Sequence, residues 1–142
     1  MAYKFKTKIV ARYAETDQMG VVHHSVYPIW YEVARTEFIK HIGISYSQME
    51  KMGVMTPLAH LQCDYKNATK YEDEVTIFVW ISKLTPARIE FSYEMYKSSD
   101  NIFEKPINTG KTLHGFTDTL LKPLNMKKNY PDIFQNMLKL TY

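Results

Sequence analysis

The chain has 142 residues, a formal net charge of +3, 45% hydrophobic residues and 14% aromatic residues. At this length one domain buries roughly 68–70% of the surface that the extended chain exposes, so we expect a single domain over residues 1–142. The small, dispersed positive charge argues against a nucleic acid partner, and no apolar stretch is long enough for a membrane span. The first ten residues lack the apolar run of a secretory signal, which predicts a cytoplasmic location.

The cysteine count and the motifs of the sequence exclude further classes of protein. Cys63 is the only cysteine in the sequence, so no internal disulfide can form. The sequence has no paired-cysteine metal motif and no GxxxxGK phosphate loop. We therefore expect neither a metal site nor a cofactor.

The first predicted element is a strand over residues 4–13. Lysines and an arginine alternate there with less polar residues, as in a strand that has one buried face. The inward positions are Phe5, Thr7, Ile9, Ala11 and Tyr13. The pattern therefore places Tyr13 at the inner end of the strand, shortly before Asp17.

A long amphipathic helix is predicted over residues 25–42. Apolar residues recur there at steps of three and four, which gives a broad buried face. Pro28 would break a helix in its middle but is tolerated in the first turn, so it fixes the helix start near His24 and Ser25. Gly43 is a natural stop. The expected buried positions are Val26, Ile29, Trp30, Val33, Ala34, Phe38 and Ile42.

The next part of the chain predicts a second, shorter helix over residues 46–52. An extended segment over residues 54–65 follows it. The apolar positions Leu58, Leu61 and Cys63 of this segment are expected to be buried.

Strand patterns dominate the following stretch. Residues 75–82 are largely apolar on both faces, which predicts a central strand. Residues 88–95 alternate in polarity and predict an antiparallel neighbour that is joined to it by a hairpin. A weaker strand is predicted over residues 111–118, where Gly110 and Gly115 indicate bulges or a close approach of the backbone.

A last helix is predicted over residues 132–140. The order is thus one strand, one long apolar helix and then a run of strands. This order predicts an α+β fold in which the helix packs on an antiparallel sheet.

One motif joins the first strand to the long helix. It reads YAETD from Tyr13 to Asp17, then GVVHH at residues 20–24, Tyr27, and YEVARTE at residues 31–37. This motif resembles that of the acyl-CoA thioesterases with the hot-dog fold, in the 4-hydroxybenzoyl-CoA thioesterase and YbgC-like branch. The resemblance continues at residues 64–68 and 71–73, and more weakly at residues 110–123.

The resemblance implies a hot-dog fold, in which an antiparallel sheet wraps around one long central helix. It also implies hydrolysis of an acyl thioester of coenzyme A or of an acyl carrier protein. The enzyme would be a homodimer or homotetramer whose subunits pair edge to edge, with the active site at the interface. The family often has small residues where Gln18 and Met19 stand and commonly a Tyr where His23 stands, and these departures leave the acyl group open.

By the same resemblance, Asp17 has the central catalytic role, either attacking the thioester carbonyl or activating water. The backbone N–H groups of His24 and Ser25 would form the oxyanion hole, and the side chains of His24 and Tyr13 would support catalysis. The chemistry is physically reasonable, because a helix start offers unpaired N–H groups and the positive end of the helix dipole.

Each of these residues also has a plainer interpretation. An Asp shortly before a Gly often bonds its own turn, a His at a helix start can be a loop or capping residue, and a Tyr at a strand end can pack in the core. The register of the motif favours catalysis for Asp17, whereas both interpretations stay open for His24 and Tyr13. His60 and His114 lie in strand patterns and are more typical of structural histidines.

Four residues are predicted to contact the substrate. Met19 and Tyr27 are candidates for the acyl pocket. Lys66 and Arg88 lie near strand ends where the phosphates of coenzyme A could dock, and a guanidinium can hold a phosphate in a bidentate way.

Two other function classes stay open at this point. One is a non-catalytic protein that binds acyl-CoA on the same fold. The other is a dehydratase for hydroxyacyl thioesters, which needs an acid and a His arranged around the β-carbon.

Overall fold

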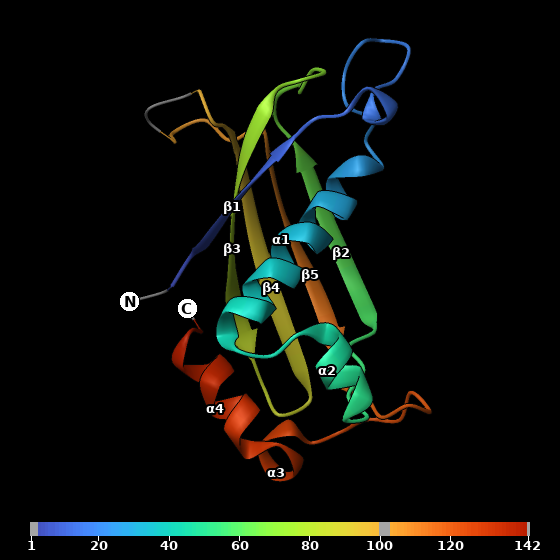
Figure 1. Cartoon of the computed structure of the whole chain (residues 1–142), viewed down its shortest axis with the longest axis vertical. Helices are drawn as coiled ribbons and strands as arrows, with labels where there is room; N and C mark the ends of the chain where they lie inside the picture. Colours follow the sequence, from blue (N-terminus) through green and yellow to red (C-terminus); the bar gives the residue numbers. More distant parts are fainter. Residues whose placement is uncertain (1–2, 100–102, 142) are drawn as a thin grey trace.

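The structure is a computed structural model that describes residues 3–99 and 103–141 (Figure 1). Within them, one antiparallel sheet contains β1 (Phe5–Val10), β2 (Leu58–Tyr65), β3 (Glu74–Leu84), β4 (Arg88–Lys97) and β5 (Asn108–Gly115). The helices are α1 (Val26–Ile42), α2 (Tyr46–Lys51), α3 (Met126–Asn129) and α4 (Pro131–Lys139), and a single 3-10 turn covers Tyr13–Glu15. The order across the sheet is β1-β3-β4-β5-β2, so β1 and β2 are its edges. The predicted α+β fold is confirmed.

Helix α1 begins and ends where the sequence predicts. It starts at Val26, so Pro28 lies in its first turn, and it ends at Ile42, because Gly43 adopts a left-handed conformation with φ of 111°. No helix in the two described stretches is long and apolar enough to cross a membrane.

The buried face of α1 differs in part from the prediction. Trp30, Ala34 and Phe38 are fully buried as expected, but Ile29 is 55% exposed and Val33 is also exposed. The remaining buried positions are Val26, Tyr27, Tyr31 and Ile39. Both tyrosine hydroxyls find partners in the interior: Tyr27 donates to Thr69 and Tyr31 to Asn108, while the Tyr31 ring stacks on Tyr93 of β4.

The predicted strand over residues 4–13 ends earlier, at Val10. Its alternation of half-buried and exposed residues is confirmed up to that point. Tyr13, however, lies in the 3-10 turn and is 77% exposed, with its ring edge-on to Tyr71 at 5.6 Å. The prediction that Tyr13 points inward is wrong, because the chain leaves the sheet before reaching it.

The extended segment before residue 65 forms β2 at the edge of the sheet. Leu58 is 55% exposed and Leu61 is also exposed, while Cys63 is half-buried. The predicted burial of both leucines is therefore wrong for the single chain. The reason is positional, since β2 pairs with β5 on one side only.

The predicted hairpin is confirmed, with β3 between β1 and β4. The next strand, β5, begins at Asn108, before the predicted position, and Gly110 in it lies close to α1. A Cβ atom on Gly110 would collide with the ring of Tyr31, which stacks on Tyr93 at 4.2 Å. The close backbone approach predicted at Gly110 is confirmed. A Cβ atom on Gly115 would meet open space.

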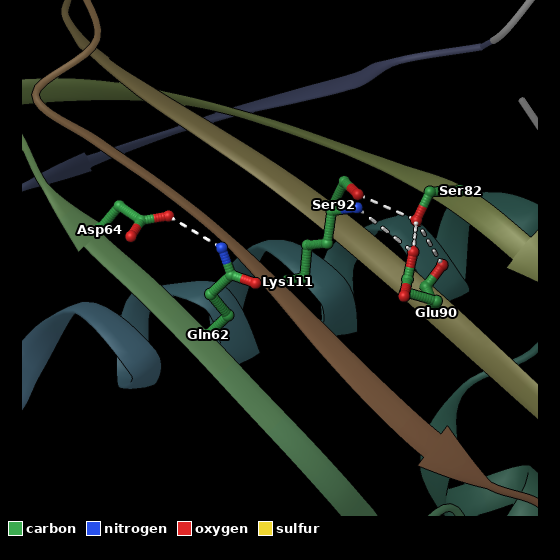
Figure 2. Close-up of polar contacts among 6 residues, drawn as sticks. All are labelled: Gln62, Asp64, Ser82, Glu90, Ser92 and Lys111. Atoms are coloured by element: carbon green, nitrogen blue, oxygen red, sulfur yellow. Dashed lines mark hydrogen bonds and ion pairs between the residues drawn. The ribbon is translucent and has the colours of Figure 1, made fainter.

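The face of the sheet that points away from α1 carries a polar network (Figure 2). Ser82 donates to Glu90 Oε1 at 2.7 Å, and Ser92 donates to Ser82 at 2.9 Å. Lys111 Nζ lies 3.8 Å from the same Glu90 oxygen. The hydrophobic core therefore lies on the other face, between the sheet and α1.

Candidate functional site

A tight turn after the 3-10 turn presents Asp17. Its N–H donates to the Val21 carbonyl at 2.8 Å, and its carbonyl accepts from Gly20 at 3.0 Å. Its carboxylate Oδ1 accepts from the Met19 N–H at 2.9 Å. Gly20 has φ of +80°, a conformation that favours glycine. Asp17 is thus a turn-former through one oxygen, while Oδ2 accepts no hydrogen bond from the described residues.

The start of α1 lies next to this turn, and the His24 N–H is among its backbone donors without a partner in the described residues. The Val26 N–H donates to the His23 carbonyl at 3.0 Å, and the Ser25 N–H donates to His23 Nδ1 at 3.2 Å. Ser25, predicted as an oxyanion donor, is therefore already paired, because the His23 ring folds back over the turn. Within the described stretches, the His24 N–H has no such partner.

Asp17 and the start of α1 line one cleft of about 340 Å³. Of the predicted site residues, the structure brings five together here. They are Asp17, Met19, His24, Tyr27 and Lys66. Met19 is 81% exposed, so its side chain lies at the mouth of the cleft.

Ser25 is not among the cleft residues, and two further predicted site residues lie elsewhere. Tyr13 points into solvent against Tyr71 and does not line the cleft. Arg88 starts β4 beside the turn that joins β3 to β4, whereas the Asp17 turn lies at the other end of the sheet in Figure 1. The structure therefore does not place Arg88 in this cleft of its own chain.

Tyr65 is a cleft residue that the sequence analysis missed. Its hydroxyl donates to the His24 carbonyl at 2.7 Å and so holds the helix start against the end of β2. Burial, followed by the neighbouring Cys63, raises the pKa of Tyr65 to about 12, so the hydroxyl keeps its proton. One sequence feature could have identified Tyr65. It lies at the end of a predicted extended segment, next to Asp64 and within the stretch 64–68 that resembles the family.

Glu15 was also missed, although it fixes the loop that carries Asp17. It is buried, and its Oε2 accepts from the Trp30 indole N–H at 2.9 Å while Oε1 accepts from the Arg12 N–H at 2.8 Å. Burial alone would raise the pKa of Glu15, but the hydrogen bonds from Arg12 and Trp30 outweigh it and lower the pKa. The carboxylate thus ties the Asp17 loop to α1.

A Glu15→Gln variant is expected to lose roughly 1–3 kcal/mol of unfolding free energy at pH 7. The amide NH₂ group of Gln can only donate, and it would face either the Arg12 N–H or the Trp30 indole N–H, which are also donors. The lowered pKa means that this stabilisation is present above the ordinary value of 4.5 and is lost as pH falls through the folded-state pKa. Urea unfolding at pH 7 and pH 3.5 measures both effects. Glu37→Gln, which alters an exposed glutamate of α1, is the control. Equal losses of unfolding free energy in Glu15→Gln and Glu37→Gln would contradict the role of Glu15 in tying the Asp17 loop to α1.

A sequence model of the thioesterase-like superfamily matches residues 11–133. The chain belongs to the thioesterase-like superfamily. The hot-dog fold and the thioester hydrolase class that the motif predicts are thereby confirmed for the family.

Individual relatives agree with this family. YneP of Bacillus subtilis is 35% identical over 128 residues, which cover 89% of this chain and 90% of YneP. The acyl-CoA thioester hydrolase YbgC of Escherichia coli is 24% identical over 126 residues, covering 88% and 91% of the two chains. The crystal structure of DHNA-CoA thioesterase from Staphylococcus aureus matches with a TM-score of 0.88 and 33% identity, covering 96% of this chain and 90% of that one.

Proposed function

We propose that this thioesterase hydrolyses an acyl-CoA to free acid and thiol, with Asp17 as the nucleophile or general base and the His24 N–H as the oxyanion donor. One observation carries the proposal. The free Asp17 oxygen and the unpaired His24 N–H at the helix start belong to residues that line the same cleft.

The local geometry suits attack on a thioester carbonyl. The turn holds Asp17 through Oδ1, so Oδ2 is left for the carbonyl carbon or for a water molecule. The negative charge that develops on the carbonyl oxygen then meets an N–H donor at the positive end of the α1 dipole. The His24 ring lines the cleft beside that donor.

The rest of the cleft suits the two ends of the substrate. Tyr27 and Met19 offer apolar surface for the acyl group. Lys66 contributes a cation near the mouth, where a coenzyme A phosphate would find a partner. The named activity of YbgC supports coenzyme A as the thiol.

We further propose that the chain forms a homodimer through β2. One side of this strand has no neighbour within the described chain, and Leu58, Leu61 and Tyr65 along it are exposed. An unpaired strand with exposed apolar side chains is a ready template for a second copy. An antiparallel β2 pair also agrees with the edge-to-edge pairing that the family resemblance implies.

Free-thiol release from a panel of short, branched, aromatic and long acyl-CoAs tests the reaction. Steady turnover of at least one member is expected, and the same acyl groups on an acyl carrier protein test the carrier. Tight binding without thiol release would instead indicate a non-catalytic binder. Hydration of an enoyl-CoA without thiol release would indicate a dehydratase.

A further inference from the structure

The turn that follows β5 exposes two adjacent leucines. Leu120 is 74% exposed and Leu121 is 66% exposed, more than any other leucine among the described residues. Figure 1 shows this turn, in orange-red, standing out from the lower end of the molecule, past α2 and away from the Asp17 loop. The two leucines form a projecting apolar tip that the described chain does not cover.

Backbone contacts fix the shape of this turn. Asp118 Oδ1 accepts from the Leu120 N–H at 2.8 Å and from the Lys122 N–H at 3.0 Å. At the base of the turn, Thr117 and Met55 exchange two backbone hydrogen bonds, at 2.9 and 2.8 Å. The turn is therefore well ordered and holds both leucines away from the core.

The conformation of Leu121 is unfavourable for a leucine. Its φ is +62°, in the left-handed region that favours glycine. The Asp17 turn has the same hydrogen-bond pattern, and the equivalent position there is Gly20, with φ of +80°. Leu121 thus strains its turn and, being exposed, adds little to the core. A strained and exposed apolar residue of this kind indicates a contact outside the chain.

Three segments of the chain meet at the end of the molecule that carries this turn. The Met126 N–H donates to the Pro86 carbonyl at 2.8 Å, which ties the segment after the turn to the link between β3 and β4. The Tyr130 hydroxyl donates to the Met52 carbonyl at 2.7 Å, which ties the same segment to the end of α2. Met52 is itself exposed, so it adds apolar surface to this end.

These three segments hold the excess positive charge of the protein. Residues 50–53, 83–88 and 118–132 together contain six cations and three acidic residues, a net charge of +3, which equals the formal net charge of the whole chain. None of the six cations forms an ion pair with a described residue. Lysines that are dispersed in the sequence are thus brought together beside the leucines. The cations are Lys51, Lys83, Arg88, Lys122, Lys127 and Lys128.

We propose that this end of the molecule docks on an anionic phospholipid bilayer, with Leu120 and Leu121 inserted among the lipids and the cations facing the lipid phosphates. A projecting apolar tip enters a fluid lipid layer directly, whereas a folded protein partner would need a matching pocket. Each lysine near an anionic surface is attracted to it, and burial of the leucines adds an apolar contribution. Docking is reversible, because two leucines bury little surface. It does not depend on the chemistry proposed for Asp17.

Co-sedimentation with lipid vesicles tests the docking. The whole chain is mixed, in about 0.1 M NaCl, with large vesicles of phosphatidylcholine and phosphatidylglycerol in equal amounts, or of phosphatidylcholine alone. We expect the wild type to bind the anionic vesicles at least about 10-fold more tightly than the neutral ones. Salt raised to about 0.5 M should release it, because the attraction to the lipid phosphates is screened.

Two double variants separate the apolar contribution from the charged one. Leu120→Ser with Leu121→Ser removes the tip and should weaken binding to anionic vesicles at least about 10-fold. Lys127→Gln with Lys128→Gln should weaken it about 10-fold and make it less sensitive to salt. Ile29→Ser is the matched control, since Ile29 is also well exposed but lies at the start of α1, and it should bind as the wild type does.

Leu121→Gly tests whether the leucine is retained at the expense of stability. Glycine adopts a φ of +62° without strain, so this variant should unfold at a higher urea concentration than the wild type and bind anionic vesicles more weakly. A lower urea midpoint would show that Leu121 stabilises the folded chain, and the inference would then be wrong.

Two further results would overturn the inference while leaving the proposed function intact. One is a wild type that does not bind anionic vesicles, or binds them as tightly as the leucine and lysine variants do. The other is a smaller oligomer of Leu120→Ser with Leu121→Ser in light scattering, which would assign the turn to a contact between subunits. Neither measurement involves thiol release, so neither bears on the role of Asp17.

Discussion

An Asp17→Asn variant is expected to hydrolyse acyl-CoA about 10³-fold more slowly than the wild type, with an unchanged fold. The amide oxygen can still accept from the Met19 N–H, as Oδ1 does at 2.9 Å, so the turn survives. The charge that would attack the carbonyl or activate water is lost. Thiol release under single-turnover conditions measures the chemical step, and circular dichroism checks the fold.

Asp118 provides a matched control within the same chain. Its N–H donates to the Lys122 carbonyl at 2.8 Å, and its carbonyl accepts from Leu121 at 3.0 Å. Its Oδ1 accepts from the Leu120 N–H at 2.8 Å, so the turn repeats the one at Asp17. Asp118 does not line the Asp17 cleft, and Asp118→Asn should keep full activity. Equal losses in both variants would attribute the effect to the turn rather than to chemistry.

This pair of turns shows what local pattern can and cannot say about the site. A carboxylate that bonds its own backbone is common, and the two aspartates are alike at that level. What distinguishes Asp17 is the helix that starts a few residues later, whose position Pro28 fixes because proline is tolerated only in the first turn. The sequence therefore predicts correctly that Asp17 lies beside the helix start, while its catalytic role stays a prediction.

Contacts between distant segments could not be predicted in the same way. Glu15 meets Trp30 only because the chain forms a 3-10 turn after β1, and that turn is also what exposes Tyr13. Leu58 looks like a core residue in any alternating strand, and only the order of strands shows that it lies at an edge. The series of hydrogen bonds that begins at Arg35 joins three elements and has no local signature.

Acid is expected to destabilise the protein through His114 before most carboxylates titrate. Its pKa is lowered from the ordinary 6.5 to about 4, first by burial and then by the charge of Arg35. Between these two values the unfolded chain binds a proton that the folded chain does not. The unfolding free energy should therefore fall as pH drops from 6.5 to 4, by about 2 kcal/mol at pH 5 and about 3 kcal/mol in total.

A His114→Gln variant isolates this contribution. The variant is expected to be less stable at pH 7, because Thr112 and the Thr56 carbonyl lose a partner with matching geometry. Its stability should nevertheless change much less than that of the wild type between pH 6.5 and pH 5. Urea unfolding at one fixed protein concentration measures both, since the stability of a dimer depends on concentration.

The His114 ring itself provides the decisive measurement. Glu32, Glu50 and Tyr46 line the same cavity as His114, and of these only the two glutamates could favour the imidazolium. If they outweighed burial and the Arg35 charge, the ring would titrate near or above 6.5, and wild type and variant would lose stability in parallel. A His114 Cε1 proton signal that stays in the neutral form down to about pH 5 would show instead that burial and the charge of Arg35 keep the ring uncharged.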